Sequence, residues 1–406
     1  MDLEPGIIKS LIDSDLYKFT MQQAVCKLFP RVKVRYKFIN RGKTKFPEGF
    51  GAELRKEVAK MANLSLTKEE KIFLKKRCGR FLDDVYIDFL SSYQFDPSEV
   101  GIIQNGSDLD IDFEGYWYKT ILWEVPMMAL VSELYFKMTG EKINDRNSRE
   151  KNNFEKGKVF YGHNMKLADF GSRRRYSYEN QFEVCSDIKK VFGSEKFFVG
   201  TSNVHIAMKL DLTPIGTHAH EWFMFMGAKY GFKMANTKAL ENWVDVYQGD
   251  LGIALSDTYT TDVFFKTFDK KYAKLFDGVR HDSGDAFVFI NKTVAHYKSI
   301  GINPADKTIV FSDGLNTALS LEISEYCSKK GDGIKCSFGI GTNLTNDVGV
   351  KPLNMVIKMT SAFIVDEWVD TVKLSDNEGK HTGNSEMVDL AERLLGINKK
   401  KELQST

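Results

Sequence analysis

The hydrophobic and polar positions of the first 140 residues change their period several times along the chain. Residues 14–29 have the spacing of a helix that ends before Pro30, and Ser14 or Asp13 would suit the cap of its first turn. Residues 32–40, VKVRYKFIN, alternate with period two, which predicts a strand. The mixture of both periods indicates an α+β domain.

Residues 51–158 also mix predicted helices with predicted strands. Residues 51–93 are polar and amphipathic and predict several short helices, while residues 100–115 predict a hairpin with its turn at Asn105-Gly106. Pro126 fits the first turn of a following helix. The charged residues 141–158 predict a surface loop and a further helix.

From about residue 165 the pattern becomes a cycle of short apolar strand, small polar loop and amphipathic helix. The units share this architecture without a repeated sequence, and they are LADFGSRRR, KFFVGTSNVHIAMKL, PIGTHAHEW, LGIALSDTYTTDVFFKTF, GVRHDSGDAFVFINKTVAHY, TIVFSDGLNTALSLEISEY and IKCSFGIGTNL. Alternating strands and helices predict a parallel sheet with helices outside it.

Two folds fit such a cycle, a β/α barrel and a doubly wound open sheet. The open sheet would need one topological switch point, whereas nearly every strand here ends in a loop rich in Gly, Ser, Thr and Asp. In a barrel such loops gather at one face, where the chemistry takes place. We therefore expect an irregular, TIM-like β/α barrel.

After residue 345 the chain returns to strand-like segments, LNMVIKM and TVKLSD. We expect a barrel domain over residues 141–349 and an N-terminal domain over residues 1–140, which residues 350–406 complete. The lysine-rich tail from residue 398 is expected to be a solvated end.

Composition narrows the class of protein. The chain has 406 residues, 42% of them hydrophobic, and 57 basic against 55 acidic residues give a net charge of +2, which argues against nucleic acid or an anionic membrane as the main partner. Its five cysteines are scattered without a CxxC motif, and the start lacks a hydrophobic signal core. No apolar run approaches the roughly 20 residues of a membrane span. We expect a soluble cytoplasmic protein.

Three consecutive strand ends carry groups suited to phosphate or sugar. RHDSGD (280–285) places carboxylates around a turn, FSDGLN (311–316) places Asp313 before a helix, and FGIGT (338–342) brings glycines and a threonine to a helix start. Each has an ordinary alternative, a solvated turn or a helix cap, and no GxGxxG fingerprint is present. Their succession along the chain favours a phosphate and sugar site.

DFGSRRR (169–175) and GTHAHEW (216–222) add further candidates. Arginine suits bidentate contacts to carboxylates and phosphates, although a basic surface turn is the alternative. His218 and His220 face the same side of an extended segment and could bind one zinc ion, but no third ligand is evident. The ordinary alternative for either residue is a core histidine whose ring nitrogens are hydrogen-bonded. Among functional roles, a histidine that accepts a phosphoryl group agrees best with the neighbouring loops.

Taken together, these motifs resemble the nicotinate phosphoribosyltransferase family. The resemblance runs from LIDSDLYKFTMQQAV through ILWEVPMMALVSE, FFVGTSN, LGIALSDTYTTD and the loops above to VKPLNMVIK, and so covers nearly the whole chain. It implies a type II phosphoribosyltransferase-like fold and the formation of nicotinate mononucleotide from nicotinate and phosphoribosyl pyrophosphate in NAD biosynthesis. It also implies ATP as co-substrate, Mg²⁺ held mainly through substrate phosphates rather than by a protein metal site, and a homodimer.

The resemblance also implies roles for single residues. His220 matches the phosphorylated histidine, whereas His218 receives no role. Contacts to nicotinate fall to Thr217, Arg280, Tyr17, Phe170 and Arg173, with Tyr17 and Phe170 on the two faces of the pyridine ring and Tyr17 reaching across from a neighbouring subunit. The 5′-phosphate loop falls to Gly339, Gly341 and Thr342, and the ribose side to Asp282 and Asp313, with Asp257 as a weaker candidate and Gly314 as a further substrate-binding residue.

The chemistry implied by the resemblance needs no general base, because the pyridine nitrogen has no proton to lose when it attacks the sugar. Asp282 is expected to stabilise the cationic sugar carbon electrostatically. Two rivals remain, a nicotinamide- or quinolinate-specific relative and a non-catalytic phosphocarrier. An amide substrate would favour an acid in the GTSN loop, where Ser202 tolerates a carboxylate, and the intact ribosyl motifs argue against the phosphocarrier.

Overall fold

Five antiparallel strands form the first sheet of the computed structural model, which describes residues 6–377 and 380–397. Their order is β11 (Glu367–Asp370), β10 (Val356–Ile364), β1 (Lys33–Ile39), β3 (Asp108–Tyr116) and β2 (Val100–Asn105). Strand β1 lies where its alternation predicts it, because Val34, Tyr36 and Phe38 are buried on one face. The predicted hairpin is β2–β3, and Gly106 has the positive φ of 58° that a tight hairpin turn requires.

Helices predicted in the first half are present and pack around this sheet. They are α1 (Leu16–Leu28), α2 (Phe50–Met61), α3 (Lys68–Cys78), α4 (Asp84–Ser92), α5 (Trp117–Thr120) and α6 (Glu124–Thr139), with 3₁₀ turns η1 (Pro97–Glu99) and η2 (Ile121–Trp123). Helix α3 begins with a capping box, because the Glu70 amide donates to Thr67 Oγ1 and the Thr67 amide donates to the Glu70 carboxylate.

The predicted cap of the first helix is wrong. Helix α1 begins at Leu16, its N-cap position is Asp15, and Asp15 makes no side-chain capping bond. Asp13 instead forms a fully buried ion pair with Arg175 at 2.7 Å. A charged side chain that can reach a buried guanidinium gains more there than at an exposed amide, which local sequence cannot reveal.

Strands far apart in the sequence complete the first sheet. Strand β10 pairs with β1 in antiparallel register, so that Lys358 lies opposite Lys37. The LNMVIKM segment therefore lies partly in a strand, as predicted. The TVKLSD segment does not, because only Lys373 forms an isolated bridge, to Thr382.

Six parallel strands follow one another around a ring in chain order. The hydrogen-bonded order is β5 (Phe198–Thr201), β4 (Lys166–Asp169), β9 (Lys335–Ile340), β8 (Thr308–Phe311), β7 (Gly278–His281) and β6 (Ile253–Leu255). Strand β4, the earliest of these in the chain, pairs with β9, the latest, and no reversal of strand order occurs. This is the arrangement of a barrel rather than of a doubly wound sheet.

An extended segment without a regular strand fills the gap between β5 and β6. Pro214 forms a parallel bridge with Thr201, and the Ile215 amide donates to the Thr201 carbonyl. On the other side, Thr217 Oγ1 donates to the Ile253 carbonyl at 3.1 Å. The strand expected in PIGTHAHEW is therefore absent, and this segment is the irregular part of the barrel wall.

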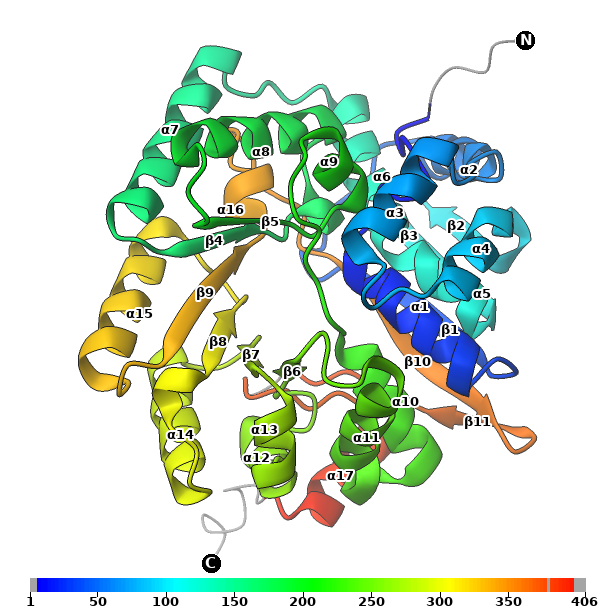
Figure 1. Cartoon of the computed structure of the whole chain (residues 1–406). Helices are drawn as coiled ribbons and strands as arrows, with labels where there is room; N and C mark the ends of the chain where they lie inside the picture. Colours follow the sequence, from blue (N-terminus) through cyan, green and yellow to red (C-terminus); the bar gives the residue numbers. More distant parts are fainter. Residues whose placement is uncertain (1–5, 378–379, 398–406) are drawn as a thin grey trace, which may run out of the picture.

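Helices cover the outside of the ring, and α7, α8, α14 and α15 lie around it in Figure 1. The second half contains α7 (Arg146–Gly162), α8 (Tyr178–Phe192), α9 (Val204–Lys209), α10 (His220–Tyr230), α11 (Ala235–Tyr247), α12 (Thr261–Thr267), α13 (Lys270–Leu275), α14 (Ala286–Ser299), α15 (Thr317–Lys330), α16 (Thr342–Thr345) and α17 (Ser385–Leu395). Its 3₁₀ turns are η3 (Ser172–Arg174), η4 (Phe232–Met234) and η5 (Pro304–Asp306). The predicted tail from residue 398 lies outside the described residues.

The segment before α1 is attached to the barrel through its backbone. The Leu16 amide donates to the Ser202 carbonyl, and the Val204 and His205 amides donate to the carbonyls of Ser14 and Ile12. These bonds hold the start of α1 against the loop that follows β5. The segment before α1 therefore forms part of the edge of the barrel.

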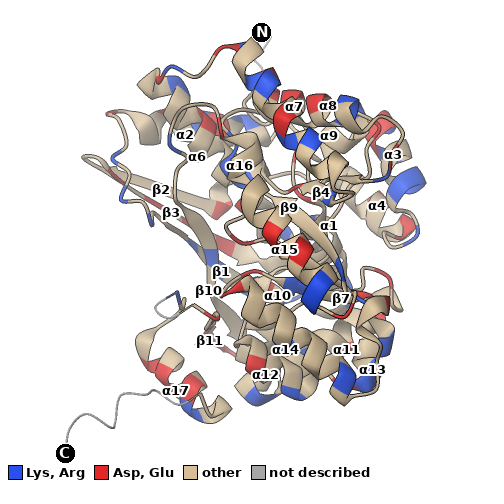
Figure 2. Cartoon of the chain, turned by 90° about the vertical axis from the view of Figure 1, so that its left-hand side faces the viewer, with Lys and Arg blue, Asp and Glu red and all other residues tan. Residues whose placement is uncertain are grey.

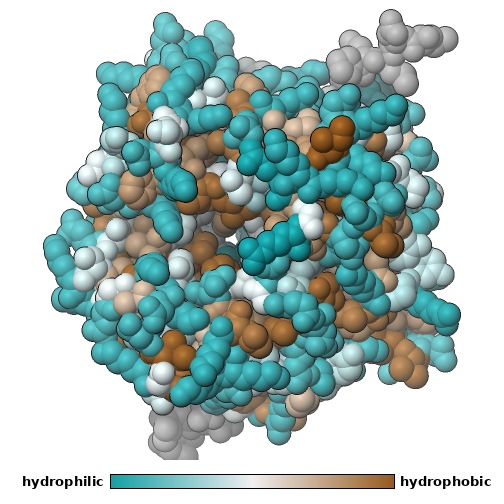
Figure 3. Space-filling model, viewed as in Figure 1, coloured by the Kyte–Doolittle hydropathy of each residue, from teal (hydrophilic) through white to brown (hydrophobic). Residues whose placement is uncertain are grey.

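The surface agrees with the near-balance of charge. Figure 2 shows basic and acidic positions interspersed on the outer helices, and Figure 3 shows hydrophilic side chains over most of one face with smaller apolar patches between them. Within the described residues, no helix has the length and apolar character that a membrane crossing requires.

Candidate active site

A cavity of about 210 Å³ lies where the carboxyl ends of the barrel strands face the first sheet. Residues predicted from the sequence form much of its wall, namely Tyr17, Phe170, Arg173, Ser202, His220, Arg280, Asp282, Asp313 and Gly341. Its remaining polar wall comes from Asp15, Arg41, Glu124, Arg174, Glu221, Lys358, Lys373 and Lys380, among others. The ring of loops thus brings together side chains that are far apart in the sequence.

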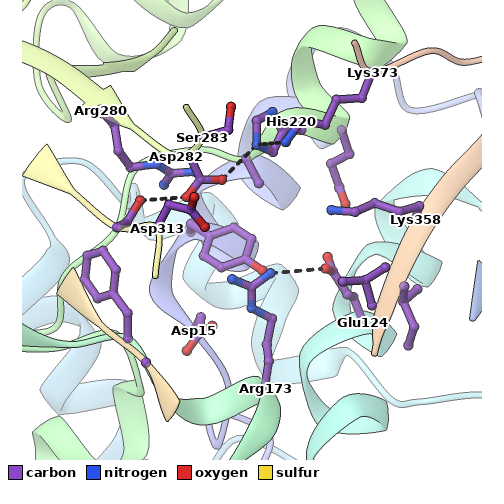
Figure 4. A pocket seen from close by; sticks show the side chains of 18 of the residues that line it. Asp15, Glu124, Arg173, His220, Arg280, Asp282, Ser283, Asp313, Lys358 and Lys373 are labelled. Atoms are coloured by element: carbon purple, nitrogen blue, oxygen red, sulfur yellow. Dashed lines mark hydrogen bonds and ion pairs between the residues drawn. The ribbon is translucent and has the colours of Figure 1, made fainter. Parts of the chain in front are cut away.

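His220 is the first residue of α10 and is almost completely buried. Its Nδ1 lies 3.0 Å from Thr258 Oγ1, and its Nε2 lies 2.9 Å from Asp282 Oδ2 and 2.9 Å from Lys373 Nζ (Figure 4). Burial, reinforced by the nearby Lys373 ammonium, lowers the pKa of His220 to about 4. The imidazole is therefore neutral near pH 7, so that one of its two nitrogens carries a lone pair.

Asp282 follows β7 and is held from two sides. Ser312 Oγ donates to its Oδ1 at 2.6 Å, while His220 contacts its Oδ2. Burial alone would raise its pKa, but the charges of Arg280 and Lys373 and the bond to His220 outweigh burial and hold the pKa well below its usual range. Asp282 is consequently a carboxylate at all physiological pH values.

Asp257 lies beneath the cavity rather than in its wall. Ser283 Oγ donates to its Oδ2 at 2.5 Å, Lys373 Nζ lies 3.5 Å from the same oxygen, and its Oδ1 lies 3.7 Å from His220 Nε2. Asp257, Asp282 and His220 each offer one ligand atom, and these atoms all lie within 4.8 Å of one another. The sequence suggested the three residues separately but not as one cluster.

His218 has a different environment from His220. Its Nε2 accepts the Leu255 amide at 3.2 Å, and its ring packs edge-on against Trp243 at 4.6 Å. It is buried and does not line the cavity. The two histidines therefore do not act as a metal-binding pair, and His218 has the contacts of a packed core histidine.

Tyr17 and Phe170 both line the cavity of the same chain. Tyr17 is 8% exposed, and its hydroxyl is buried without a hydrogen-bond partner. The expectation that Tyr17 reaches the site of a neighbouring subunit is therefore wrong, because the backbone bonds of residues 12–16 to the barrel already bring it into its own site.

Ser202 lies beside an acid that the sequence did not single out. Its Oγ donates to Asp15 Oδ1 at 2.7 Å, and both residues line the cavity. Burial raises the pKa of Asp15, which the charge of Arg173 and the bond from Ser202 offset in part. The GTSN loop has no acid of its own, but Asp15 supplies one beside it.

Several predicted residues support the wall without lining it, namely Thr217, Asp257, Gly314, Gly339 and Thr342. Gly339 lies directly under the Phe170 ring, where any Cβ would lie 2.3 Å from the ring carbons. Thr342 begins α16, which has only four residues, and Gly314 has a positive φ of 59°. These residues shape the loops after β8 and β9.

The basic and acidic residues opposite the barrel were missed in the sequence. Lys358 extends from β10 into the cavity (Figure 4), and burial lowers its pKa to about 8. Lys18 is fully buried between Glu124 and Glu221, at 2.5 and 2.6 Å. A lysine within an otherwise apolar segment, as in DLYKFTM, VIKM and TVKL, is the signal that could have identified Lys18, Lys358 and Lys373.

Comparisons with known proteins agree with this geometry. The model of the nicotinate phosphoribosyltransferase (NAPRTase) family matches residues 165–399, and that of the family's N-terminal domain matches residues 12–132. A nicotinate phosphoribosyltransferase of Chromohalobacter salexigens is 52% identical over 97% of this chain and 100% of its own length. One from Desulforapulum autotrophicum is 50% identical over 94% and 97%. The crystal structure of nicotinate phosphoribosyltransferase from Porphyromonas gingivalis superposes with a TM-score of 0.92 at 46% identity, covering 96% of this chain and 99% of that one.

Proposed function

Since this chain belongs to the nicotinate phosphoribosyltransferase family, we propose that its cavity joins nicotinate to phosphoribosyl pyrophosphate and that His220 couples this step to ATP hydrolysis. The chain is an enzyme of this type and acts in NAD biosynthesis. The observation that carries the assignment of the site is the neutral His220 with Asp282 and Lys373 each 2.9 Å from its Nε2, in a cavity lined by Tyr17 and Phe170.

In the ribosyl step, the pyridine nitrogen of nicotinate forms a bond to C1 of the ribose while the bond from C1 to the pyrophosphate oxygen breaks. The nitrogen carries no proton, so no base has to remove one. Asp282, which stays ionised, stabilises the positive charge on the sugar carbon. The leaving pyrophosphate takes both electrons of the broken bond, and the cations Arg41, Lys358, Lys373 and Lys380 in the cavity wall bind it.

The aromatic and arginine side chains position nicotinate. Tyr17 and Phe170 offer flat faces for the pyridine ring, and stacking contributes roughly 0.5–1.5 kcal/mol for each ring pair. Arg173 and Arg280 are the guanidinium groups available for its carboxylate, with Thr217 behind them in the barrel wall. The Arg280 Nε atom is buried without a partner, which leaves it available to a ligand.

In the phosphoryl step, His220 Nε2 attacks the γ-phosphorus of ATP, and the bond from this phosphorus to the β,γ-bridging oxygen breaks, so that ADP leaves. The reactive tautomer carries its proton on Nδ1, which donates to Thr258 Oγ1, and Nε2 then accepts from Lys373 Nζ. The contact of Nε2 with the Asp282 carboxylate, which can only accept, has to be given up before the attack. Lys373 contacts Nε2 and supplies positive charge where the phosphoryl group arrives. Water later hydrolyses the phosphohistidine and releases phosphate.

The loops after β7, β8 and β9 complete the sugar-phosphate side of this proposal. Gly339, Gly341 and Thr342 are assigned to the 5′-phosphate, Asp313 and Asp257 to the ribose side, and Gly314 to substrate binding in the same loop as Asp313. Asp313 and Gly341 line the cavity, which supports this assignment. The proposed division of the chain remains residues 1–140 with 350–406, and residues 141–349.

The carboxylates fit a magnesium ion held largely by substrate phosphates. Asp257 and Asp282 offer oxygen ligands, the donor type that Mg²⁺ prefers, and Asp257 Oδ1 is buried without a hydrogen bond. When bound there, Mg²⁺ would neutralise negative charge on the pyrophosphate. Few protein ligands are needed, because Mg²⁺ keeps several waters and binds through phosphates.

We also propose a cytoplasmic location, with which the free cysteines agree. A homodimer remains a prediction, although the reach of Tyr17 no longer supports it.

Turnover of radiolabelled nicotinate tests the proposed function. With phosphoribosyl pyrophosphate and Mg²⁺, nicotinate should give labelled nicotinate mononucleotide, and ATP should accelerate the reaction. Labelled nicotinamide should give little product. Faster use of nicotinamide, or phosphorylation of the protein without any mononucleotide, would favour one of the two rival functions.

A further inference from the structure

Residues 371–377 follow β11 and cross from the first sheet to the barrel. The Leu374 amide donates to the Thr258 carbonyl at 2.8 Å, in the loop after β6. Asn377 Oδ1 accepts the Gly284 amide at 3.0 Å, in the loop after β7. This crossing segment therefore connects the sheet with two of the loops that surround the active site.

Asp376 binds the crossing segment to the barrel with both of its carboxylate oxygens. Its Oδ1 accepts the Thr261 amide at 2.8 Å, and its Oδ2 accepts Thr261 Oγ1 at 2.5 Å. The Asp376 amide donates to Ser283 Oγ at 3.1 Å. One residue thus holds the crossing segment against the start of α12 and against the loop that carries Asp282.

The backbone is strained on both sides of this attachment. Thr260 has a φ of 71° and Ser375 a φ of 74°, in a region that residues other than glycine rarely adopt. Such conformations persist only where surrounding contacts enforce them, and they cluster at functional sites. Asp376 follows Ser375 directly and binds the residue after Thr260, so its two bonds hold both strained positions. Without these bonds we expect the crossing segment to relax away from the barrel.

Lys373 lies in the crossing segment and contacts His220 (Figure 4). Its Nζ lies 2.9 Å from His220 Nε2, and Asp282 Oδ2 lies 2.9 Å from the same nitrogen. An ammonium group can only donate a hydrogen bond and a carboxylate can only accept one, so these two neighbours favour opposite tautomers of the imidazole. The Thr258 hydroxyl at Nδ1 can donate or accept and therefore does not decide between them. The position of Lys373 determines whether Nε2 carries a proton.

We propose that Asp376, by binding Thr261, holds Lys373 Nζ against His220 Nε2 and thereby selects the tautomer of His220 that can attack phosphorus. The proposal rests on the proposed phosphorylation of His220. With Lys373 in place, Nε2 accepts its hydrogen bond and the imidazole proton lies on Nδ1. When Lys373 is withdrawn, Nε2 takes the proton, donates to Asp282 and has no lone pair. Asp376 does not line the active-site cavity and acts as a positioning residue.

Nitrogen-15 NMR of protein with labelled histidine measures this tautomer directly. Near pH 7, His220 Nε2 of the unaltered protein should give the chemical shift of a ring nitrogen without a proton, and H220A identifies the signal by its loss. In D376A the same nitrogen should give the shift of a protonated ring nitrogen. D376N should resemble the unaltered protein, because its side chain can still accept the Thr261 amide and can donate to Thr261 Oγ1. An unprotonated Nε2 in folded D376A would overturn the proposal.

The rate of phosphorylation provides an independent test. In a single turnover with ATP labelled at its γ position, D376A should be phosphorylated roughly 10- to 100-fold more slowly, as expected when a reacting group is misplaced by a small distance. T261V keeps the shape of Thr261 but loses the hydroxyl bond to Asp376, and it should also be slow. T261S keeps the hydroxyl and is the matched control, with a rate near that of the unaltered protein.

The outcomes separate this role from the proposed function. Slow synthesis of nicotinate mononucleotide without ATP should persist in D376A and show that the ribosyl site is folded. If D376A does not fold, T261V and T261S decide, and equal phosphorylation rates for these two variants would contradict the role of Asp376. An unaltered protein that ATP does not label would instead refute the proposed phosphorylation itself.

Discussion

Individual side chains decide the chemistry of this site, and His220 does so most directly. It is held in a neutral form by burial, and its two nitrogens have different partners, Thr258 and the pair of Asp282 and Lys373. A protonated imidazole would have no lone pair with which to attack phosphorus. With a pKa of about 4, His220 keeps this lone pair near neutral pH, as the proposed phosphoryl transfer requires.

H220A should abolish labelling of the protein by ATP carrying radioactive phosphorus at its γ position. Stimulation of mononucleotide synthesis by ATP should disappear, while slow ATP-independent synthesis remains because the ribosyl residues are intact. The acid-labile label is measured after gel separation, with H163A as the control, since His163 is an exposed residue at the end of α7. Label that persists in H220A would place the phosphoryl group elsewhere.

Lys358 should make the use of phosphoribosyl pyrophosphate sensitive to pH. Burial lowers the pKa of this lysine to about 8, so its charge is present below pH 8 and is lost as the pH rises through that value. The kcat/KM for phosphoribosyl pyrophosphate, which reports groups of the free enzyme, should fall above pH 8. In K358R the fall should move beyond pH 9, because arginine stays charged. An identical profile for both proteins would contradict a role of Lys358 in binding the leaving group.

Ser202 remains a predicted determinant of substrate choice, although its partner Asp15 changes the reason. S202D would place a carboxylate next to Asp15 and near the carboxylate of nicotinate, and like charges in a dry site cost on the order of several kcal/mol. The kcat/KM for nicotinate should fall at least 100-fold, and that for nicotinamide should fall less or rise. S202A, which removes only the hydroxyl, should have a smaller effect. An unchanged ratio of the two constants would rule out this role.

Helices and strands were the part of the structure that the sequence predicted best. Alternation located β1, the Asn105-Gly106 turn located the hairpin β2–β3, and short apolar runs located most barrel strands, because each of these strands buries one face or both. It failed for PIGTHAHEW, which is extended but pairs through only one bridge, and for TVKLSD. Periodicity reports burial of alternate side chains, and it cannot distinguish a laddered strand from an extended segment held by side-chain bonds.

The contact between Asp13 and Arg175 should stabilise the protein more than a helix cap does. Arg175 is fully buried and also binds Glu133, so D13A leaves a buried charge partly unpaired. The free energy of unfolding in urea should fall by about 3–5 kcal/mol. D145A removes an exposed N-cap of α7 and should lower the free energy of unfolding by much less. Equal losses for D13A and D145A would show that Asp13 acts as no more than a cap.

Across the protein as a whole, the site residues in the barrel loops were predictable and those opposite them were not. RHDSGD, FSDGLN and FGIGT follow parallel strands, and the carboxyl ends of such strands meet at one face. Lys358 enters the cavity only because its strand β10 pairs with β1, and Lys373 follows the neighbouring strand β11. That pairing joins segments separated by most of the chain, and no local pattern specifies it.

A mixture of two inactive variants should stay inactive. Tyr17 and Arg280 line the cavity of one chain, so neither Y17A nor R280A can be complemented by a partner. Activity of the mixture is measured after subunits have been exchanged by dilution from mild denaturant, with refolded wild-type protein as the control. Recovery towards half of the wild-type activity would show instead that Tyr17 acts across an interface.

The bonds between residues 12–16 and 202–205 also determine when the enzyme can mature during translation. Asp15 and Ser202 lie 187 positions apart, and at roughly 5–20 residues per second the ribosome needs about 10–40 s to deliver the second after the first. Throughout this interval the nascent amino-terminal segment, with its apolar Ile12 and Leu16, has no docking site. The substrate pocket is thus assembled late, and a chaperone that shields this segment on the ribosome would raise the yield of active enzyme.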